Sequence, residues 1–259
     1  MNLSRLARMR CALRSLVLQG AWNFDRMQNL GWAFCVEPAL KELYPDPVRR
    51  RAALRRHLEL FNTHPYMSGF VLGAALKAEA EAAAGPEGGD AERHVSAIKT
   101  GLSPALAAVG DSFFWATLRP MAALLGVVWL WLAPHPLHLA APLVFLAAYN
   151  FPGLWMRIHS LEAGWSRGDA VAVHVAGLGL PAKTEGLRRT ALVLVGALAG
   201  SLAVVTHPAS GETVPIVNNF LFLGAGLFML LLLRLAARPV VLMVLSTLGA
   251  LVLAMAVHV

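Results

Sequence analysis

Residues 108–120 read AVGDSFFWATLRP and place a carboxylate, Asp111, and a guanidinium, Arg119, in an otherwise apolar stretch. The stretch leads directly into a more strongly apolar run, residues 121–133. A charged side chain at membrane depth is costly, and it is retained mainly where it is paired or lines a polar cavity. The stretch therefore predicts a membrane protein with a polar feature inside the membrane.

The composition agrees with a membrane protein. The chain has 259 residues, of which 57% are hydrophobic and 14% charged, whereas about a quarter of the residues of a soluble domain are charged. Residues 191–205, 217–233 and 239–257 are long apolar runs with almost no charge, and roughly 20 such residues span a bilayer. We therefore predict an all-α integral membrane protein with about three to five transmembrane helices, and a soluble helical protein is excluded.

The positive charge lies near the N-terminus. Residues 1–56 hold 11 Lys and Arg and 4 Asp and Glu, a net of 11 − 4 = +7, which equals the formal net charge of the whole chain. Basic segments of membrane proteins face the cytoplasm, so we expect a cytoplasmic N-terminus. Residues 207–214 contain no Lys or Arg, which predicts an external C-terminus. Nucleic-acid binding is a poor explanation, because the basic region is attached to membrane spans.

Three regions are expected along the chain. Residues 1–60 predict basic amphipathic helices that are cytoplasmic or interfacial, residues 61–165 a membrane core with broken helices and a linker near 85–93, and residues 166–259 transmembrane helices. Residues 3–18 suit a helix at the headgroup boundary with its cations toward anionic lipid headgroups, or a surface helix of a soluble subdomain. Each region therefore has its own relation to the membrane.

Short apolar segments interrupted by proline or glycine predict broken or re-entrant helices. The run 121–133 would be about 20 Å long as a helix, which is less than the hydrocarbon core of roughly 30 Å, and Gly110 interrupts the segment before it. Such segments are typical of transport sites. For residues 137–156 an ordinary kinked helix is equally compatible. Gly69 and Gly73 have the spacing that lets membrane helices pack closely.

Polar side chains cluster just before Pro65, which prevents the preceding helix from continuing. Asn62, Thr63 and His64 all carry hydrogen-bond donors and acceptors. Such a cluster suits the hydroxyl groups of a sugar. It could equally be a cap for the helix that begins near Pro65.

Asp111 and Trp115 form a second candidate set. The carboxylate could accept hydrogen bonds from sugar hydroxyls, and the indole could stack on a pyranose ring. Alternatively, Asp111 could pair with Lys99 or Arg119 as a structural lock. A helix separates Asp111 from Arg119 by about 12 Å, so that pair would require a broken segment.

Catalytic and metal-binding motifs are missing from the sequence. It has no phosphate-binding glycine loop, no pair of catalytic carboxylates and no Cys or His set with metal-ligand spacing. His135 and His138 lack a third ligand nearby, and Cys11 and Cys35 are expected only to pack. His57 follows several arginines and is expected to contact solvent. We therefore expect no cofactor, no metal and no catalysis by this chain alone.

Ordered motifs between residues 21 and 120 resemble a known family. They are AWNFDRMQNLG (21–31), EPALKELY (37–44), FNTHP (61–65), AIKTGLSP (97–104), GDSFFW (110–115) and TLRP (117–120). This set is similar to the IID subunit of the mannose/fructose/sorbose family of sugar phosphotransferase system (PTS) permeases. Outside residues 21–120 the likeness lies only in the hydrophobic layout.

The resemblance implies a role in sugar uptake across the bacterial inner membrane. Such a multi-pass subunit pairs with a IIC membrane subunit to form the sugar pathway, while IIA and IIB proteins carry the phosphate on histidines. The sugar, a hexose or an amino sugar, is phosphorylated as it enters, and the IID subunit carries no phosphate. Residues 213–219 replace the family's usual Leu-Pro-rich segment. A regulatory or structural membrane partner without efficient transport therefore remains an alternative.

Overall fold

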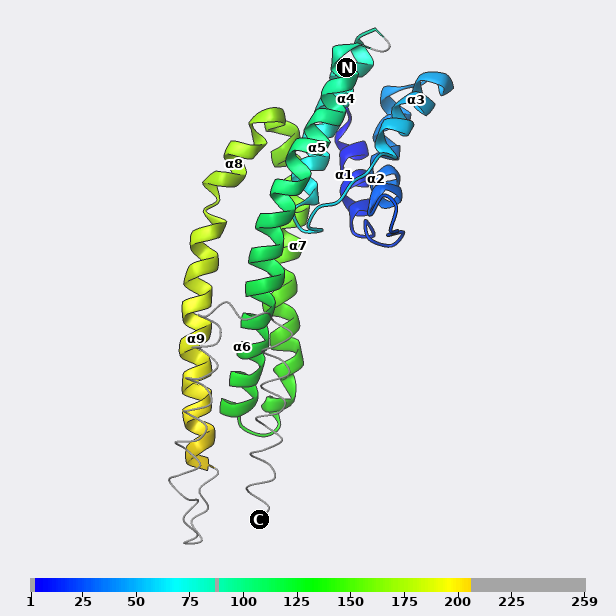
Figure 1. The fold of residues 1–259 in the computed structure, drawn as a ribbon. Coiled ribbons are helices and arrows are strands. Elements are labelled where there is room, and N and C mark those ends of the chain that lie inside the picture. Colours follow the sequence, from blue (N-terminus) through cyan, green and yellow to red (C-terminus); the bar gives the residue numbers. More distant parts are fainter. Residues whose placement is uncertain (1–2, 87–88, 206–259) are drawn as a thin grey trace. The chain divides into compact units, whose positions relative to one another are not determined.

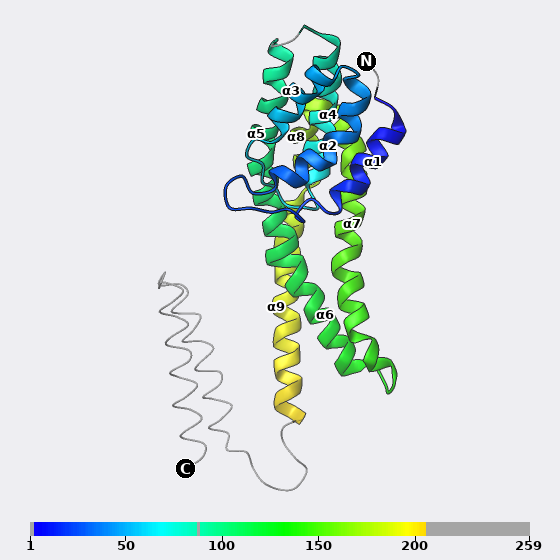
Figure 2. The ribbon, with the colours of Figure 1, turned by 90° about the vertical axis from the view of Figure 1, so that its right-hand side faces the viewer.

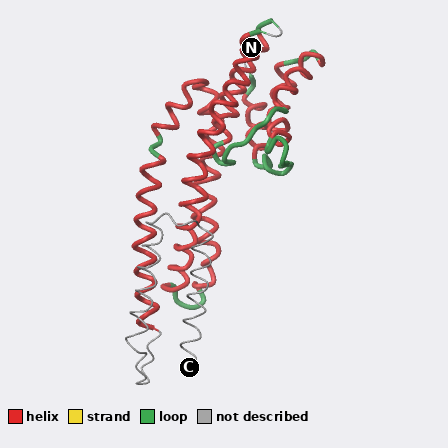
Figure 3. Tube along the Cα trace, viewed as in Figure 1, coloured by secondary structure: helices red, strands yellow, loops and turns green. Residues whose placement is uncertain are grey.

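The computed structural model describes residues 3–86 and 89–205 (Figure 1). The chain divides into two compact units, Met1–Val195 and Gly196–Val259. Within the described ranges the structure is nearly all helical and contains no β-strand (Figure 3), so the predicted all-α class is confirmed. The apolar runs predicted at 217–233 and 239–257 lie outside the described residues.

The described helices follow one another with short connections. They are α1 (Arg5–Ser15), α2 (Asn29–Leu43), α3 (Pro47–His57), α4 (Ser68–Ala84), α5 (Asp90–Gly110), the π-helix η1 (Asp111–Leu118), α6 (Arg119–Leu132), the 3₁₀-helix η2 (Leu137–Ala140), α7 (Ala141–Arg167), the 3₁₀-helix η3 (Gly168–Ala170), α8 (Val171–Gly177) and α9 (Leu180–Val205). Helix α3 begins where Asp46 accepts hydrogen bonds from the N–H groups of Val48 and Arg49, with Pro47 in the first turn. Both features favour a helix start.

Two helical stretches of the described chain are long and apolar enough to cross a membrane. They are Asp90–Leu132, with 43 residues, and Leu137–Leu192, with 56 residues. Helices α6 and α7 pack against each other and extend together away from α1, α2 and α3 (Figure 2). In the turn between α6 and α7, the Trp129 indole N–H donates to the Leu137 carbonyl at 2.9 Å.

The broken helix predicted around Gly110 is not present: the chain stays helical there and only changes to a π-helix at residues 111–118. Helix α5 continues without a gap through η1 into α6. In η1 the Thr117 hydroxyl donates to the carbonyl of Ser112, five residues earlier, at 2.8 Å. Helices with i to i+5 hydrogen bonds are rare and occur frequently at functional sites. Pro104 in α5 and Pro152 in α7 do not end their helices.

Glycines bring α4 and α7 into backbone contact. A Cβ atom at Gly69 would lie 2.9 Å from the carbonyl oxygen of Arg157, and one at Gly73 would lie 2.1 Å from that of Leu161. On α7, a Cβ at Gly164 would lie 2.3 Å from the carbonyl oxygen of Phe70. The close packing predicted from the glycine spacing in α4 is therefore present, with α7 as the partner helix.

Helix α1 presents an apolar stripe away from the protein. Ala7 and Cys11 are buried, whereas Leu6, Leu13 and Leu16 are about half exposed. Leu3, just before the helix, is buried. This exposed apolar stripe is compatible with the predicted contact with a lipid surface, which stays a prediction.

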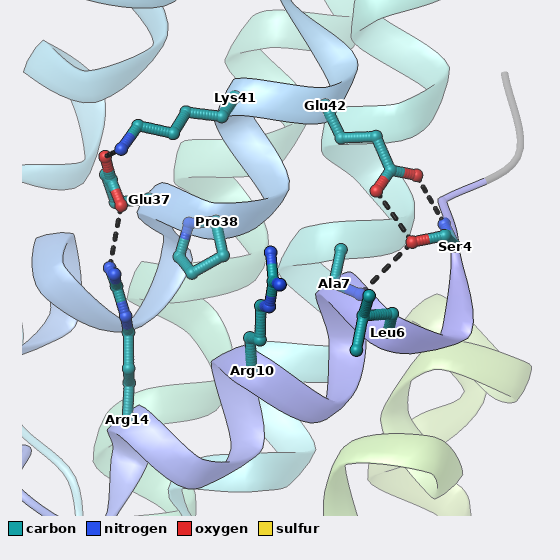
Figure 4. A pocket seen from close by; sticks show the side chains of 9 residues that line it. All are labelled: Ser4, Leu6, Ala7, Arg10, Arg14, Glu37, Pro38, Lys41 and Glu42. Atoms are coloured by element: carbon teal, nitrogen blue, oxygen red, sulfur yellow. Dashed lines mark hydrogen bonds and ion pairs between the residues drawn. The ribbon is translucent and has the colours of Figure 1, made fainter.

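Arg10 and Arg14 of α1 line a pocket against α2. Figure 4 shows a pocket of about 410 Å³ between the two helices. In it Arg14 pairs with Glu37 at 2.7 Å, and Glu42 accepts hydrogen bonds from Ser4. These contacts tie both ends of α1 to the C-terminal half of α2.

Candidate functional site

The loop between α3 and α4 carries the first candidate set and lies between α2 and α5. Thr63 is buried, and its hydroxyl donates to the Ser103 carbonyl of α5 at 3.1 Å. Helix α4 begins only at Ser68, with no side-chain cap, so neither Asn62 nor Thr63 caps it. Because its hydroxyl is hydrogen-bonded to α5, Thr63 holds the loop against that helix.

His64 is buried with one ring nitrogen left over. Its Nδ1 accepts a hydrogen bond from the Tyr66 N–H at 3.2 Å, so the neutral ring carries its proton on Nε2. That Nε2 is buried and has no hydrogen-bond partner among the described residues. Burial, with a smaller contribution from Arg157, lowers the pKa of His64 to about 4. His64 is therefore a neutral donor that an incoming acceptor could satisfy.

The two candidate motifs meet at this histidine. The His64 ring stacks on Phe114 with centroids 5.0 Å apart and meets the edge of Trp115 at 4.8 Å. A Cβ atom at Gly110 would lie 2.3 Å from the His64 Cβ, so only glycine allows this approach. The structure thus brings residues 62–64 and 110–115 together.

Polar groups on the open side of the contact have no partner in the described part of the chain. Asn62 and Asp111 are exposed, and no hydrogen bond or ion pair from either side chain is present there. Trp115 is 42% exposed. An amide and a carboxylate without a partner among the described residues therefore lie beside the buried His64, next to the partly exposed Trp115 ring that contacts it.

The pairing of Asp111 as a structural lock is not seen. The Lys99 ammonium group donates instead to the carbonyl oxygen of Arg56 and lies 3.5 Å from the Glu59 carboxylate. Arg119 is exposed and forms no ion pair with any described residue. The geometry leaves Asp111 available for another molecule.

A buried ionic cluster was not predicted. Glu79 of α4 is fully buried and accepts hydrogen bonds from Arg56 at 2.7 and 3.0 Å, from Tyr44 at 2.7 Å and from His57 at 2.8 Å. The Trp32 indole N–H donates to the other nitrogen of His57 at 2.9 Å. The expectation that His57 contacts solvent is wrong, because α2 and α4 cover it completely.

The cluster is electrostatically satisfied. Burial opposes the ionised form of Glu79, but hydrogen bonds and charges from His57 and Arg56 outweigh it and lower the pKa of Glu79 to about 2. Burial lowers the pKa of His57, although Glu79 raises it in part. The cluster joins α2, α3 and α4 near the loop. The run 74–84 is rich in alanine and contains two glutamates, Glu79 and Glu81, and the sequence alone does not show which of them is buried.

Metal ligands do not gather in the described part of the chain. It contains no group of three or more His, Cys, Asp or Glu side chains that could hold a metal ion. His135 and His138 lie close together in the turn after α6, with ring centroids 5.1 Å apart. Cys11 and Cys35 are buried and free, and burial raises the pKa of both thiols to about 12.

Known proteins are similar to this chain in sequence and in fold. Residues 2–258 match the family described as "PTS system mannose/fructose/sorbose family IID component". The mannose-specific EIID component of Escherichia coli K12 is 39% identical over 197 residues, which cover 76% of this chain and 68% of that protein. The sorbose-specific EIID component of Klebsiella pneumoniae is 34% identical over 245 residues, 88% of this chain and 87% of that protein.

A solved structure is similar over almost the full length. It is a chain of the cryo-EM structure of the mannose transporter ManYZ in complex with microcin E492. The two chains are 32% identical with a TM-score of 0.59, and the match covers 99% of this chain and 97% of the other. The likeness extends beyond residues 21–120, where the sequence motifs lie.

Proposed function

This chain belongs to the family of IID components of the mannose/fructose/sorbose PTS, and from that premise we propose that it forms, with a IIC subunit, the membrane pathway for hexose uptake. Uptake would be coupled to phosphorylation of the sugar by IIA and IIB proteins. The chain is a transport component of a permease, and we infer that it does not carry the phosphate itself.

The observation that supports a sugar pathway is the set of unpartnered polar groups around His64. Asn62 and Asp111 can hydrogen-bond sugar hydroxyls, and the half-exposed Trp115 can stack on a pyranose face. His64 adds a buried donor, Nε2–H, without a partner in the described structure. Since these groups lie open on a single chain, we propose that the IIC subunit closes the other side of the site.

The N-terminal helices are proposed to lie at the cytoplasmic leaflet. The apolar stripe of α1 (Leu6, Leu13 and Leu16) is exposed, and Arg5 and Arg10 are exposed on the same helix. This combination favours binding at a headgroup boundary that contains anionic lipids. The proposed location is the bacterial inner membrane, with the N-terminus in the cytoplasm.

The site is tested by sugar binding to the complex. The chain is co-expressed with the IIC subunit of the same system, and equilibrium binding of radiolabelled D-mannose, D-fructose and L-sorbose is measured. A polar site that loses one hydrogen-bonding group leaves its partner unpaired, at about 1–3 kcal/mol per group. Asn62→Ala and Asp111→Asn should therefore weaken binding about tenfold or more. Arg55→Ala on the exposed face of α3 is the control and should retain normal affinity.

Two results would contradict the assignment. If Asp111→Asn prevents assembly with IIC while the surviving complex binds sugar normally, Asp111 is an assembly residue and not a sugar ligand. If the wild-type complex forms but binds and transports none of the sugars, the chain is better described as a regulatory or structural partner that keeps the IID fold.

A further inference from the structure

The Gln28 side chain makes two hydrogen bonds to the backbone of Thr63, as a neighbouring β-strand would. Its Oε1 accepts a hydrogen bond from the Thr63 N–H at 3.0 Å, and its Nε2 donates to the Thr63 carbonyl at 2.9 Å. Gln28 is only 2% exposed. A single buried side chain therefore satisfies both backbone polar groups of Thr63, its N–H and its C=O.

Gln28 is itself held firmly. Its backbone N–H donates to the Phe61 carbonyl at 2.8 Å, and the adjacent Asn29 amide donates to the Leu58 carbonyl at 2.9 Å. The preceding residue, Met27, has a φ of 56°, a left-handed conformation that few non-glycine residues adopt. The segment 26–29 therefore meets the loop 58–63 at several points.

The held residue lies between two groups of the proposed site. Thr63 is flanked by Asn62, which is exposed, and by His64, which is buried against η1. On its other side Thr63 is tied to α5 through the Ser103 carbonyl. A shift of the Thr63 peptide would move both neighbours at once.

We infer that Gln28 is a positioning residue, which sets the sugar affinity of the complex by fixing Asn62 and His64 without touching the sugar. This inference rests on the proposed function. It assigns a specific task to the turn between α1 and α2, which lies at the same end of the N-terminal helices as the loop 58–63 (Figure 1).

Two substitutions separate the hydrogen bonds from the shape of the side chain. Gln28→Met keeps the length but removes both hydrogen bonds, so the Thr63 N–H and C=O lose their partner. Gln28→Glu keeps an acceptor for the N–H but turns a carboxylate oxygen toward the Thr63 carbonyl oxygen. Gln19→Glu is the matched control, because Gln19 lies in the same turn, is exposed, and its side chain makes no hydrogen bond to any described residue.

The experiment uses the full chain purified with its IIC partner. Binding and uptake of radiolabelled D-mannose, D-fructose and L-sorbose are measured for each variant. Both Gln28 variants should raise Kd and KM about tenfold, while the yield of complex and the maximal uptake rate stay near wild type. The Gln19→Glu complex should be unchanged. A general loss of structure would instead lower yield and maximal rate together.

A double-mutant cycle tests the route of the effect. If Gln28 acts through Asn62, adding Asn62→Ala to Gln28→Met should raise Kd by much less than the product of the two single effects, because coupled residues are not additive. Hydrogen exchange of the segment 59–66 should also accelerate in Gln28→Met, with α4 unchanged. Multiplicative effects would overturn the inference.

The remaining outcomes are also decisive. Wild-type affinity in Gln28→Met, or failure of that variant to assemble, would overturn the positioning role, the second because Gln28 would then serve folding. Wild-type affinity in both Asn62→Ala and His64→Ala would instead refute the proposed sugar site. Failure of the inference and failure of the proposed function therefore give different results.

Discussion

Neutralising the buried carboxylate of Glu79 should destabilise the N-terminal helices severely. Glu79→Gln preserves the shape of the side chain but leaves Arg56, whose side chain is 10% exposed, with Glu92 as its remaining carboxylate partner at 3.2 Å. Breaking one side of a buried ion pair costs about 3–5 kcal/mol. The same contacts lower the pKa of Glu79 from its usual value of 4.5 to about 2 in the folded protein. That difference corresponds to about 3 kcal/mol.

The assay is thermal unfolding of the purified complex, monitored by the accessibility of Cys11 and Cys35, which are buried in the folded chain. A loss of about 3 kcal/mol should lower Tm by roughly 6–12 °C in a chain of this size. Glu81→Gln is the matched control, since Glu81 lies on the same helix, is exposed and has no partner in the described structure. It should change stability by less than about 0.5 kcal/mol. Equal melting of the two variants would refute the reasoning.

Three further predictions follow from the same structure. Gly73→Ala should prevent native packing of α4 on α7, because its Cβ would lie 2.1 Å from a backbone oxygen. Gly101→Ala, whose Cβ would have nothing within 4 Å, should instead stabilise α5 by about 0.5–1 kcal/mol. A normal yield of the Gly73→Ala complex in a detergent extract would contradict the first expectation. The stability advantage of wild type over Glu79→Gln, measured by chemical denaturation, should be constant above pH 4.5 and shrink as the pH falls toward 2. The reason is that the pKa of Glu79 is lower in the folded state, so the stabilisation requires the ionised carboxylate. A difference that grows on acidification would have the wrong sign. In a chain without Cys11 and Cys35, Pro136→Cys should react with an impermeant thiol reagent added to intact cells. Gly85→Cys should react only when the reagent can reach the cytoplasmic side. The reverse pattern would overturn the proposed orientation.

Local signals in the sequence were sufficient for several elements. Asp46 before Pro47 predicts the start of α3, and the glycines at 69 and 73 predict a close helix contact, because capping and small-residue packing depend on residues near in sequence. The family likeness likewise depended on contiguous motifs. These features need no knowledge of which helices meet.

Contacts between distant segments could not be predicted in the same way. Gln28 and Thr63 are 35 residues apart, and Glu79 and His57 are 22 apart. A sequence shows the polar residue but not the helix that covers it, so His57 was placed in solvent beside its arginine neighbours. The two candidate sets, residues 62–64 and 111–115, were each recognised at an interrupted segment, but the aromatic contacts that join them at His64 were not foreseen.

The π-helix changes the angular phase of the long helix that contains it. Successive residues of an α-helix are rotated by about 100°, and each i to i+5 loop encloses one residue more than an α-helical loop does. Periodicity counted along α5 therefore cannot be continued into α6 without a correction at residues 111–118. A one-residue deletion inside η1 could be absorbed by conversion to α-helix, whereas the same deletion in α5 would turn every later side chain to a different face. The segment beside His64 is thus the place where this helix can lose a residue without rotating its far end.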